Sequence, residues 1–492
     1  MRRLFLLLLT TICQYVAAAD TLQLSLPDAI AMARRQSLDA AVARNSLLAA
    51  YWEYRAYRAD MLPELSLVGT LPQFNQSYSA YQQADGTYKY VRNETTSLAS
   101  ALNIKQNIWL TGGRLSLTSS LDYIHDTNNR NFMSVPLSLT LEQPLFGVNH
   151  HKWHRRIEPV KYNEAKAAFI SATEEVTMKT IQYFFDLLLA NENVNIARQN
   201  KENAQRLYDI ARERRRMGHV SESDVMQLKL SLLKAEATLA RAESSKNSSL
   251  FRLRAFLDMP DSADLQVVSP PQQVLTGTPQ LAYVDVLDKA LTRNSFVQSI
   301  RRSQLEADYA VAQARGNLRD ISLNVTMGWS GIANDRLQNA YRDLRDNAIV
   351  RVGVAIPLLD WGKRRGTLRM AESNRKVTES RLRQQQQAFN QNIFLLVENF
   401  NNQRRQLSIA VEADSIARRR YQTSIETFVM GKINTLDLND AQIRKDEARQ
   451  QYINETYLFW HYYYQLRSLT LWDFSTNNSI DADFEAIICE KP

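Results

Sequence analysis

Between two long helical patterns the chain reads Met217-Gly218-His219-Val220-Ser221-Glu222-Ser223-Asp224. After this break, apolar residues recur at alternating steps of three and four, the seam of a helix that packs along another helix. They are Val225, Leu228, Leu232, Ala235, Leu239 and Ala242. No proline follows Pro159 before residue 260. Residues 159–257 therefore predict a long helical hairpin whose tip lies at Gly218.

The same design returns later in the chain. Met430 and Gly431 stand 213 positions after Met217 and Gly218, and Asp437 stands 213 positions after Asp224. Such a fixed offset indicates an internal repeat. We predict a first repeat at 20–259, a linker at 260–280 that contains four prolines, a second repeat at 281–472 and a loosely held acidic tail at 473–492.

Residues 1–19 have the pattern of a secretory signal peptide. Arg2 and Arg3 precede an apolar core, and three alanines come before Asp20. Cys13 lies inside this segment and follows a bulky isoleucine, so no lipoprotein anchor is expected. Only Cys489 lies beyond it, so no intrachain disulfide can form in the exported chain.

Composition excludes several classes of function. The net charge of +8 is mild for 492 residues and is spread along helices, which favours solvated helix faces over nucleic-acid binding. Beyond the signal no segment has the ~20 consecutive apolar residues of a membrane helix, so any membrane crossing must use strands. The chain has no Gly-x-Ser-x-Gly elbow and no glycine-rich phosphate loop. We therefore expect no enzyme and no cofactor.

Alternation of apolar and polar residues predicts strands at 65–69, 98–110, 115–123, 135–141, 321–329 and 350–358. The fuller runs match the roughly 9 to 11 residues of a tilted membrane strand. A soluble sandwich would show the same alternation. The export signal and the aromatic residues near strand ends, which are Trp109, Tyr123, Phe146 and Trp153, favour a membrane barrel with a polar lumen.

Helix lengths indicate how the repeats are built. The outgoing arm 159–217 would extend roughly 90 Å at ~1.5 Å per residue, and the return arm 224–257 is too short to match it. A helix at 28–60 can supply the missing length by stacking end to end on the return arm. The second repeat offers helices at 284–317 and 437–471 for the same purpose. One subunit would then present four helical columns with two open seams, which predicts a closed ring of subunits.

The order of these elements, the two tips and the motif Ile356-Pro357-Leu358-Leu359-Asp360-Trp361-Gly362 resemble the TolC family of outer-membrane channel-tunnels. The resemblance covers about residues 24–472. It implies an α+β fold and a homotrimer, with a transmembrane β-barrel in outer-membrane lipid and a long α-helical barrel in the periplasm. It also implies the function of an exit duct for efflux or type I secretion, served by a periplasmic adaptor (membrane fusion protein) and an inner-membrane pump.

The resemblance also implies candidate site residues. Two aspartates of the family's constriction match Asp437 and Asp440, and an aspartate of the first tip matches Asp224. Phe428 and Ile433 stand where the family has a gate tyrosine and a gate arginine. The adaptor-docking tips correspond to Met217, Gly218, His219, Met430, Gly431 and Lys432. Without the resemblance, helix capping would explain acidic residues at these helix starts equally well.

Two further features leave alternatives open. The first repeat carries about 43 additional residues before Pro144, so the pair at 98–124 either enlarges the barrel or lies outside it. His150, His151 and His154 with Glu158 have a metal-like spacing, but no distant partner is evident, so no metal site is expected. The alternative function is a periplasmic coiled-coil adaptor or structural protein, which one helical hairpin would fit better than two.

Overall fold

The computed structural model describes residues 22–489 except 127–129, 219–220, 261–264, 271–279, 319, 335, 356–358, 431 and 434. The chain divides into two compact units. The first unit contains Met1–Leu48, Ala165–Val297 and Gln387–Pro492, and the second contains Ala49–Glu164 and Gln298–Gln386. The predicted signal peptide, His219 and Gly431 lie outside the described residues.

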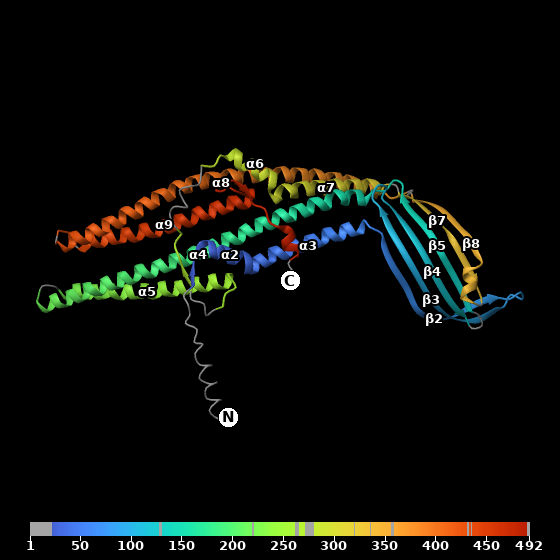
Figure 1. Cartoon of the computed structure of the whole chain (residues 1–492), viewed down its shortest axis with the longest axis horizontal. Helices are drawn as coiled ribbons and strands as arrows, with labels where there is room; N and C mark the ends of the chain where they lie inside the picture. The colour runs from blue at the N-terminus through green and yellow to red at the C-terminus, as the bar shows by residue number, and fades with distance from the viewer. Residues whose placement is uncertain are drawn as a thin grey trace, which may run out of the picture. The chain divides into compact units, whose positions relative to one another are not determined.

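Helices and strands alternate in blocks along the chain (Figure 1). The helices are α2 (Leu26–Gln36), α3 (Leu38–Asp60), α4 (His150–Arg216), α5 (Glu222–Phe256), α6 (Tyr283–Arg293), α7 (Ser295–Gly316), α8 (Lys363–Val429), α9 (Thr435–Thr470) and α10 (Phe484–Cys489). The strands are β1 (Leu22–Leu24), β2 (Glu64–Gln82), β3 (Tyr88–Ile108), β4 (Gly113–Asp126), β5 (Arg130–Pro144), β6 (Leu265–Val267), β7 (Asp320–Ala333), β8 (Leu344–Ala355), β9 (Trp472–Asp473) and β10 (Asn478–Ser479).

Two helical hairpins repeat the same construction. The outgoing helices α4 and α8 are each 67 residues long, and the return helices α5 and α9 have 35 and 36 residues. The prediction that the first outgoing helix starts at Pro159 was wrong, because α4 begins at His150 and contains this proline. A proline removes one backbone hydrogen bond. Ile157 and Val160 are buried on either side of it.

The helices predicted at 28–60 and 284–317 are each broken in two. The break falls at Ser37 between α2 and α3 and at Asn294 between α6 and α7, where the backbone is extended. The Ser37 hydroxyl accepts the Ala40 amide at 3.2 Å, and the Asn294 side-chain oxygen accepts the Phe296 amide at 2.7 Å. Serine and asparagine favour such caps over helix interiors, which explains why the continuous-helix prediction failed.

The two breaks sit against the ends of the return helices, as the stacking prediction requires. Gln36 Nε2 donates to the carbonyl of Leu257, just past α5, at 2.7 Å. Asn294 Nδ2 donates in the same way to the carbonyl of Leu469, at the end of α9, at 2.6 Å. Each side chain satisfies a carbonyl that the end of a helix leaves without a partner.

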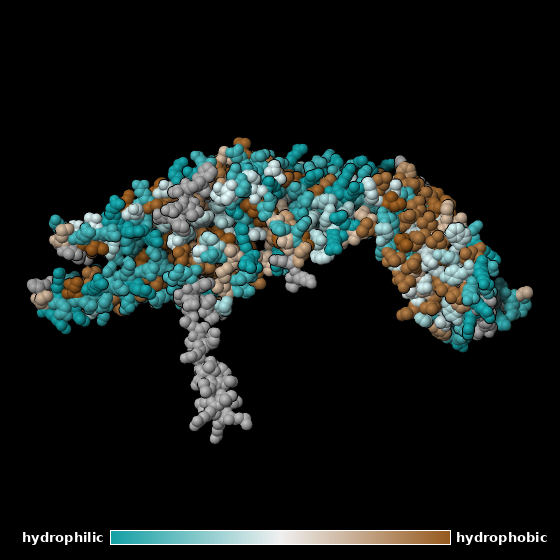
Figure 2. Space-filling model, viewed as in Figure 1, coloured by the Kyte–Doolittle hydropathy of each residue, from teal (hydrophilic) through white to brown (hydrophobic). Residues whose placement is uncertain are grey.

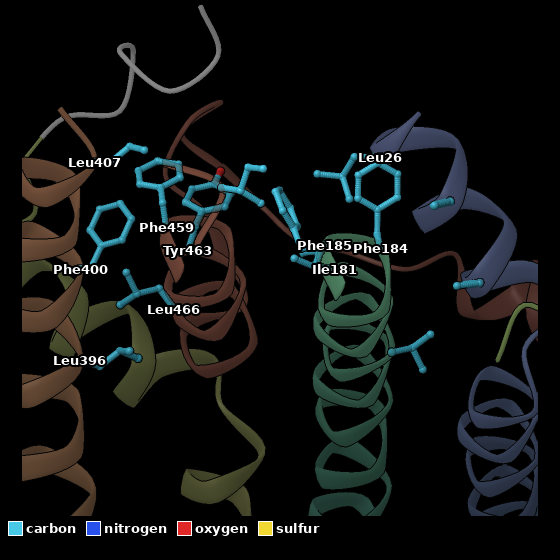
Figure 3. Close-up of a cluster of buried hydrophobic side chains, with 14 of the residues drawn as sticks. Leu26, Ile181, Phe184, Phe185, Leu396, Phe400, Leu407, Phe459, Tyr463 and Leu466 are labelled. Carbon is cyan, nitrogen blue, oxygen red and sulfur yellow. The ribbon is translucent and has the colours of Figure 1, made fainter. Parts of the chain in front are cut away.

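The first unit holds the main hydrophobic core. Its fully buried aromatic side chains, Phe184, Phe400 and Phe459, come from α4, α8 and α9, and Leu26 of α2 joins the same cluster (Figure 3). In this unit contacts run from α5 to α4, from α4 to α9 and from α9 to α8. They include Lys201 with Glu236, Asn193 with Gln450, and Gln403 with the carbonyl of Glu455.

A buried ion pair lies beside this core. Glu174 is 1 % exposed, and its two carboxylate oxygens accept hydrogen bonds from Arg34 at 2.8 Å and Arg467 at 3.2 Å. Arg467 also contacts Asp473 at 2.5 Å. A buried carboxylate with two guanidinium partners has its charge compensated on both oxygens.

The tail, which was predicted to be loosely held, and the predicted linker both make contacts with other elements. In the tail, Asp473 accepts the Tyr463 hydroxyl at 2.5 Å, β9 pairs with β10, and Phe484 of α10 packs on Phe169. In the predicted linker, β6 pairs in parallel with β1, so the start of the described chain holds it in place. The prediction of a loosely held tail was wrong, because its contacts come from residues distant in sequence and from strands of two residues.

The second unit contains a six-stranded antiparallel sheet in the order β2-β3-β4-β5-β7-β8. Its strands lie side by side in Figure 1, and Figure 2 shows apolar residues gathered over them. The extra pair predicted at 98–124 corresponds to the ends of β3 and to β4, and it lies within this sheet. β2 and β3 run well beyond the predicted segments, because residues 73–82 and 88–97 are too polar to show a clear alternation.

The helices of the second unit form one layer. Tyr54 of α3 stacks on Tyr162 of α4, Glu164 of α4 pairs with Arg302 of α7 at 2.7 Å, and Arg315 of α7 pairs with Glu372 of α8 at 3.6 Å. The order is therefore α3, α4, α7, α8. All four helix–strand connections lie at the same end of the sheet.

Candidate pore constriction and docking tips

The first tip is closed by a capped helix start. After α4 ends, Gly218 has a φ of +79°, which L side chains rarely adopt, and its amide donates to the carbonyl of Arg215 at 2.9 Å. Met217 beside it is 64 % exposed. The conformation of Gly218 explains the glycine that the sequence places there.

Asp224 is part of the cap of α5. The Ser221 hydroxyl lies 2.6 Å from Asp224 Oδ2, and the Asp224 amide donates back to the same hydroxyl at 3.2 Å. Arg215 and Glu222 add an ion pair at 2.9 Å across the tip. Capping thus accounts for Asp224 within one hairpin, and its assignment to a gate stays a prediction.

At the second tip a different backbone hydrogen bond closes the end of α8. The Lys432 amide donates to the carbonyl of Thr427 at 3.1 Å, a six-to-one bond that is typical of a helix end. Met430 is 60 % exposed, Lys432 is exposed and Ile433 is half-buried. Phe428 belongs to the last turn of α8, and its side chain is not among those described.

Asp437 and Asp440 lie in the first turns of α9, three residues apart and hence on one side of the helix. Asp437 is exposed. Asp440 is engaged by two guanidinium groups, with Arg420 Nη2 of α8 at 2.9 Å and Arg444 Nε of α9 at 3.5 Å. The sequence brings the two carboxylates together, but it did not identify these arginines.

A signal for Arg420 exists in the sequence. Arg420 and Asp440 are equidistant from Met430, and an antiparallel hairpin that turns at that residue places them opposite each other. The same symmetry relates Asp414 and Asp446, which the sequence analysis also passed over. Asp414 is buried and contacts Arg418 at 2.5 Å and Arg449 at 3.7 Å.

Polar contacts continue inward from the second tip. Gln442 contacts both Asn203 and Asn200 of α4, and Arg449 pairs with Glu192 at 3.2 Å. Burial raises the pKa of Asp446, although Lys445 lies 3.1 Å away and opposes that shift. α4, α8 and α9 are thus joined near the tips by side chains that carry charge or hydrogen-bonding groups.

The histidine cluster lies at the start of α4 in the second unit. His150 Nδ1 lies 2.5 Å from the Tyr309 hydroxyl, and His154 lies 3.3 Å from Glu158. Burial lowers the pKa of His151. Among the described residues, no group of three or more His, Cys, Asp or Glu side chains could hold a metal ion.

Helices offer no membrane span in the described part of the chain: none is both long enough and apolar enough to cross a bilayer.

A sequence profile of the family described as outer membrane efflux protein matches residues 29–257 and 286–470. The chain belongs to the outer membrane efflux protein family. The resemblance to TolC-like channels inferred from the motifs is thereby confirmed. Membership in this family assigns the protein to the outer membrane.

Relatives of this outer membrane efflux protein include secretion and resistance proteins. It is 24 % identical over 254 residues to the alkaline protease secretion protein AprF of Pseudomonas aeruginosa, covering 50 % of this chain and 52 % of AprF. It is 26 % identical over 301 residues to the cobalt-zinc-cadmium resistance protein CzcC of Cupriavidus metallidurans, covering 59 % of this chain and 66 % of CzcC. The matches thus span about half to two thirds of these relatives.

The fold is similar to that of a solved outer membrane channel. The CmeC channel of Campylobacter jejuni superposes with a TM-score of 0.65 at 16 % identity, covering 94 % of this chain and 88 % of CmeC. The predicted α+β, TolC-like fold class is confirmed. Both the family and the fold are those of channel proteins rather than enzymes.

Proposed function

We propose that three copies of this outer membrane efflux protein form the exit duct of a tripartite efflux or type I secretion system. The duct passively conducts substrates that an inner-membrane pump delivers through a periplasmic adaptor. The observation that carries the proposal is a six-stranded sheet whose outer strands, β2 and β8, have no further partner among the described residues. The layer of helices attached to this sheet likewise ends at α3 on one side and at α8 on the other.

The apolar face of the sheet supports a location in lipid. The edge strand β2 exposes Leu65, Leu67 and Leu71 by 65 %, 76 % and 85 %. Large exposed apolar patches mark membrane or protein contacts. An open edge cannot remain in hydrocarbon, because its backbone groups would lack hydrogen bonds. Pairing β2 of one copy with β8 of the next closes the sheet.

The outer helices of the first unit support association of the same copies. α5 exposes Leu230, Leu233 and Phe251, and α8 exposes Ile409 and Ile416, all at least half-exposed. In a ring, the α5 side of one subunit meets the α8 side of the next. These apolar side chains are then buried between subunits, which stabilises the ring by about 25 cal/mol for each Å² removed from water.

The two tips supply the surface for the adaptor, and α9 lines the constriction. Met217 and Met430 are apolar, exposed and placed at the two turns, where a helical partner can bury them. Methionine side chains suit such a surface because they adapt their shape. Asp437 and Asp440, repeated three times, contribute negative charge at the narrowest point. This proposal extends to Asp224, Phe428 and Ile433 as neighbours of that constriction.

The second candidate, a periplasmic coiled-coil adaptor or structural protein, would explain the hairpins alone. It leaves the six-stranded sheet with an apolar face and two open edges without a role. That sheet is the reason to prefer the duct.

Membrane fractionation and native mass measurement test the proposal together. We expect the protein in the outer membrane fraction and, after detergent extraction, a mass of three chains. A helical monomer that is recovered without membrane would contradict both the duct and its assembly. Crosslinking to an adaptor through cysteines placed at Met217 or Met430 tests the docking surface separately.

A further inference from the structure

The β3–β4 hairpin is paired along its whole length with its neighbours in the sheet. β3 pairs with β4 without irregularity from Thr95 with Asp126 to Ile108 with Gly113. β4 in turn pairs with β5 from Arg114 with Glu142 to His125 with Arg130, with one irregularity. The hairpin is therefore part of the wall of the sheet.

Near the end of the sheet that joins the helices, both faces of the sheet continue through this hairpin. Directly paired residues lie on the same face. One row of such pairs crosses all six strands and is entirely apolar: Leu65, Ile104, Leu117, Leu139, Met327 and Ala348. The next row lies on the opposite face and contains only polar residues and glycine: Ser66, Asn103, Thr118, Ser138, Gly328 and Asn347.

The polar face carries charge and hydrogen bonds on the inserted strands as well. Thr118 Oγ1 of β4 lies 2.9 Å from Asn103 Oδ1 of β3. A further row on this face contains Asn107, Arg114, Glu142, Asn324 and Arg351. In a hairpin that lies outside the membrane wall, an apolar face aligned with the apolar faces of the neighbouring strands is not expected.

The width of the sheet matches the layer of helices attached to it. Four helices side by side at axis separations of about 8–10 Å occupy about 32–40 Å. Six strands about 4.8 Å apart and tilted by about 40° occupy about 38 Å of a barrel wall, whereas four would occupy about 25 Å. The hairpin therefore makes the two layers of the second unit equally wide.

We propose that three copies close this sheet into one barrel of 18 strands, which is wide enough to pass polypeptides that keep secondary structure. The proposal rests on the three-copy duct argued above and names the size class of its cargo. At the spacing and tilt just given, 18 strands form a backbone cylinder about 36 Å across, and 12 strands form one about 24 Å across.

Side chains reduce these widths. Allowing about 5 Å on each side, half the separation of packed sheets, leaves a lumen of about 25 Å for 18 strands and about 14 Å for 12. One α-helix with its side chains is about 10–12 Å wide. A 12-stranded barrel thus admits a single helix, and the wider one admits a helical hairpin. The polar face of all six strands keeps this lumen hydrated.

Electron microscopy of the full-length trimer in lipid nanodiscs tests the proposal directly. We expect 18 strands and a backbone diameter of about 36 Å. A trimer with a 12-stranded wall and the β3–β4 hairpins folded outside it would overturn the proposal and leave the duct function standing. A protein that is neither trimeric nor in the outer membrane would instead contradict the proposed function.

A pair of shortened variants tests the width in function. In the first, residues 75–129 are replaced by Asn-Gly, so that β2 would pair directly with β5. In this variant Leu65 of β2 would pair with Leu139 of β5. In the same register, Phe74 and Arg130 would pair directly beside the new turn. The matched control replaces residues 77–93 by Asn-Gly. Gln76 and Glu94 are already paired, so this turn removes the overhanging end of β2 and β3 and keeps six strands.

The readout is the exclusion of polyethylene glycols added to the barrel side of the channel in planar bilayers. The control should keep the wild-type size limit, and the first variant should lower that limit by about 40 %, in line with lumens of about 14 and 25 Å. The same limit in all three proteins would overturn the proposal. If the first variant does not assemble, the strand count of the unmodified trimer still decides.

Discussion

Arg420 and Asp440 face each other across the second hairpin, with Arg420 Nη2 2.9 Å from Asp440 Oδ2. Arg444 lies on the other side of the same carboxylate. Arg444 also pairs with Glu447 at 3.1 Å, so the two arginines and the two carboxylates leave no net charge in this group. Asp437 lies one turn earlier on α9 and is exposed.

Replacing Arg420 by alanine should increase the cation preference of the channel. The change removes one positive charge, and a unit charge at ~8 Å in water is worth about 0.5 kcal/mol, or about two-fold in local cation concentration. Reversal potentials in planar bilayers under a salt gradient measure the effect. Stability should fall little, because an exposed ion pair contributes about 0.2–1 kcal/mol.

Arg419→Ala is the matched control for this prediction. It removes the same charge from the preceding position of α8 and leaves the bond between Arg420 and Asp440 in place. Equal selectivity changes in the two variants would mean that general charge, rather than release of the Asp440 carboxylate, sets the preference.

Much of this hairpin could be predicted from sequence, and the parts that could not have a physical reason. The apolar seam and Gly218 fixed the helices and the tip, because helix periodicity and a left-handed turn leave local signals. Ser37 and Asn294 were passed over because one capping side chain does not disturb a long helical pattern. Arg420 was missed because its partner is defined by the folding of the hairpin. β6 was missed because three residues carry no periodicity.

Replacing Glu174 by alanine should destabilise the first unit strongly. Arg467 is largely buried, and removing the shared carboxylate leaves its charge only partly compensated by Asp473. Breaking a buried ion pair from one side costs about 3–5 kcal/mol. Loss of helical circular dichroism against denaturant concentration measures the free energy of unfolding. Glu175→Ala, at an exposed neighbouring position, should cost far less, and similar losses would show that the pair does not stabilise the fold.

The contacts of Asp473 and Tyr463 should make the free energy of unfolding highest at intermediate pH and lower at both acidic and alkaline pH. Burial alone would raise the pKa of Asp473, but hydrogen bonds from Ser475 and Tyr463 and the charge of Arg467 lower it to about 2. Burial and the hydrogen bond to Asp473 raise the pKa of Tyr463 to about 12. The aspartate contribution is present above its unfolded pKa of ~3.9 and is lost as pH falls towards 2.

The tyrosine contribution has the opposite sign. It is fully present below the unfolded pKa of ~10 and is lost as pH rises through 12. Thermal unfolding measured from pH 3 to pH 11 should show a plateau in the middle. In Asp473→Asn the acid-side loss should shrink. If the loss of stability at acidic pH is unchanged in that variant, carboxylates other than Asp473 cause it.

Valine at Gly218 or Gly431 should weaken adaptor docking and export without lowering trimer yield. At Gly218 the φ of +79° costs an L side chain roughly 1–2 kcal/mol, so the turn is expected to shift. Trimer yield is measured by native mass, and docking by crosslinking to the adaptor. Gly366→Ala, inside α8 with open space around the added carbon, serves as a control. Normal export and crosslinking in both valine variants would exclude the tips as the docking surface.

Asp437→Asn combined with Asp440→Asn should reduce cation preference and block by multivalent cations, with little change in the folded trimer. Six carboxylates in three copies would be lost, and the field that holds cations would fall with them. Lys432 could replace the polar gate contacts that Phe428 and Ile433 cannot make. Lys432→Ala should therefore raise conductance only modestly. Unchanged selectivity in the double variant would leave both aspartates as caps of α9 and place the constriction elsewhere.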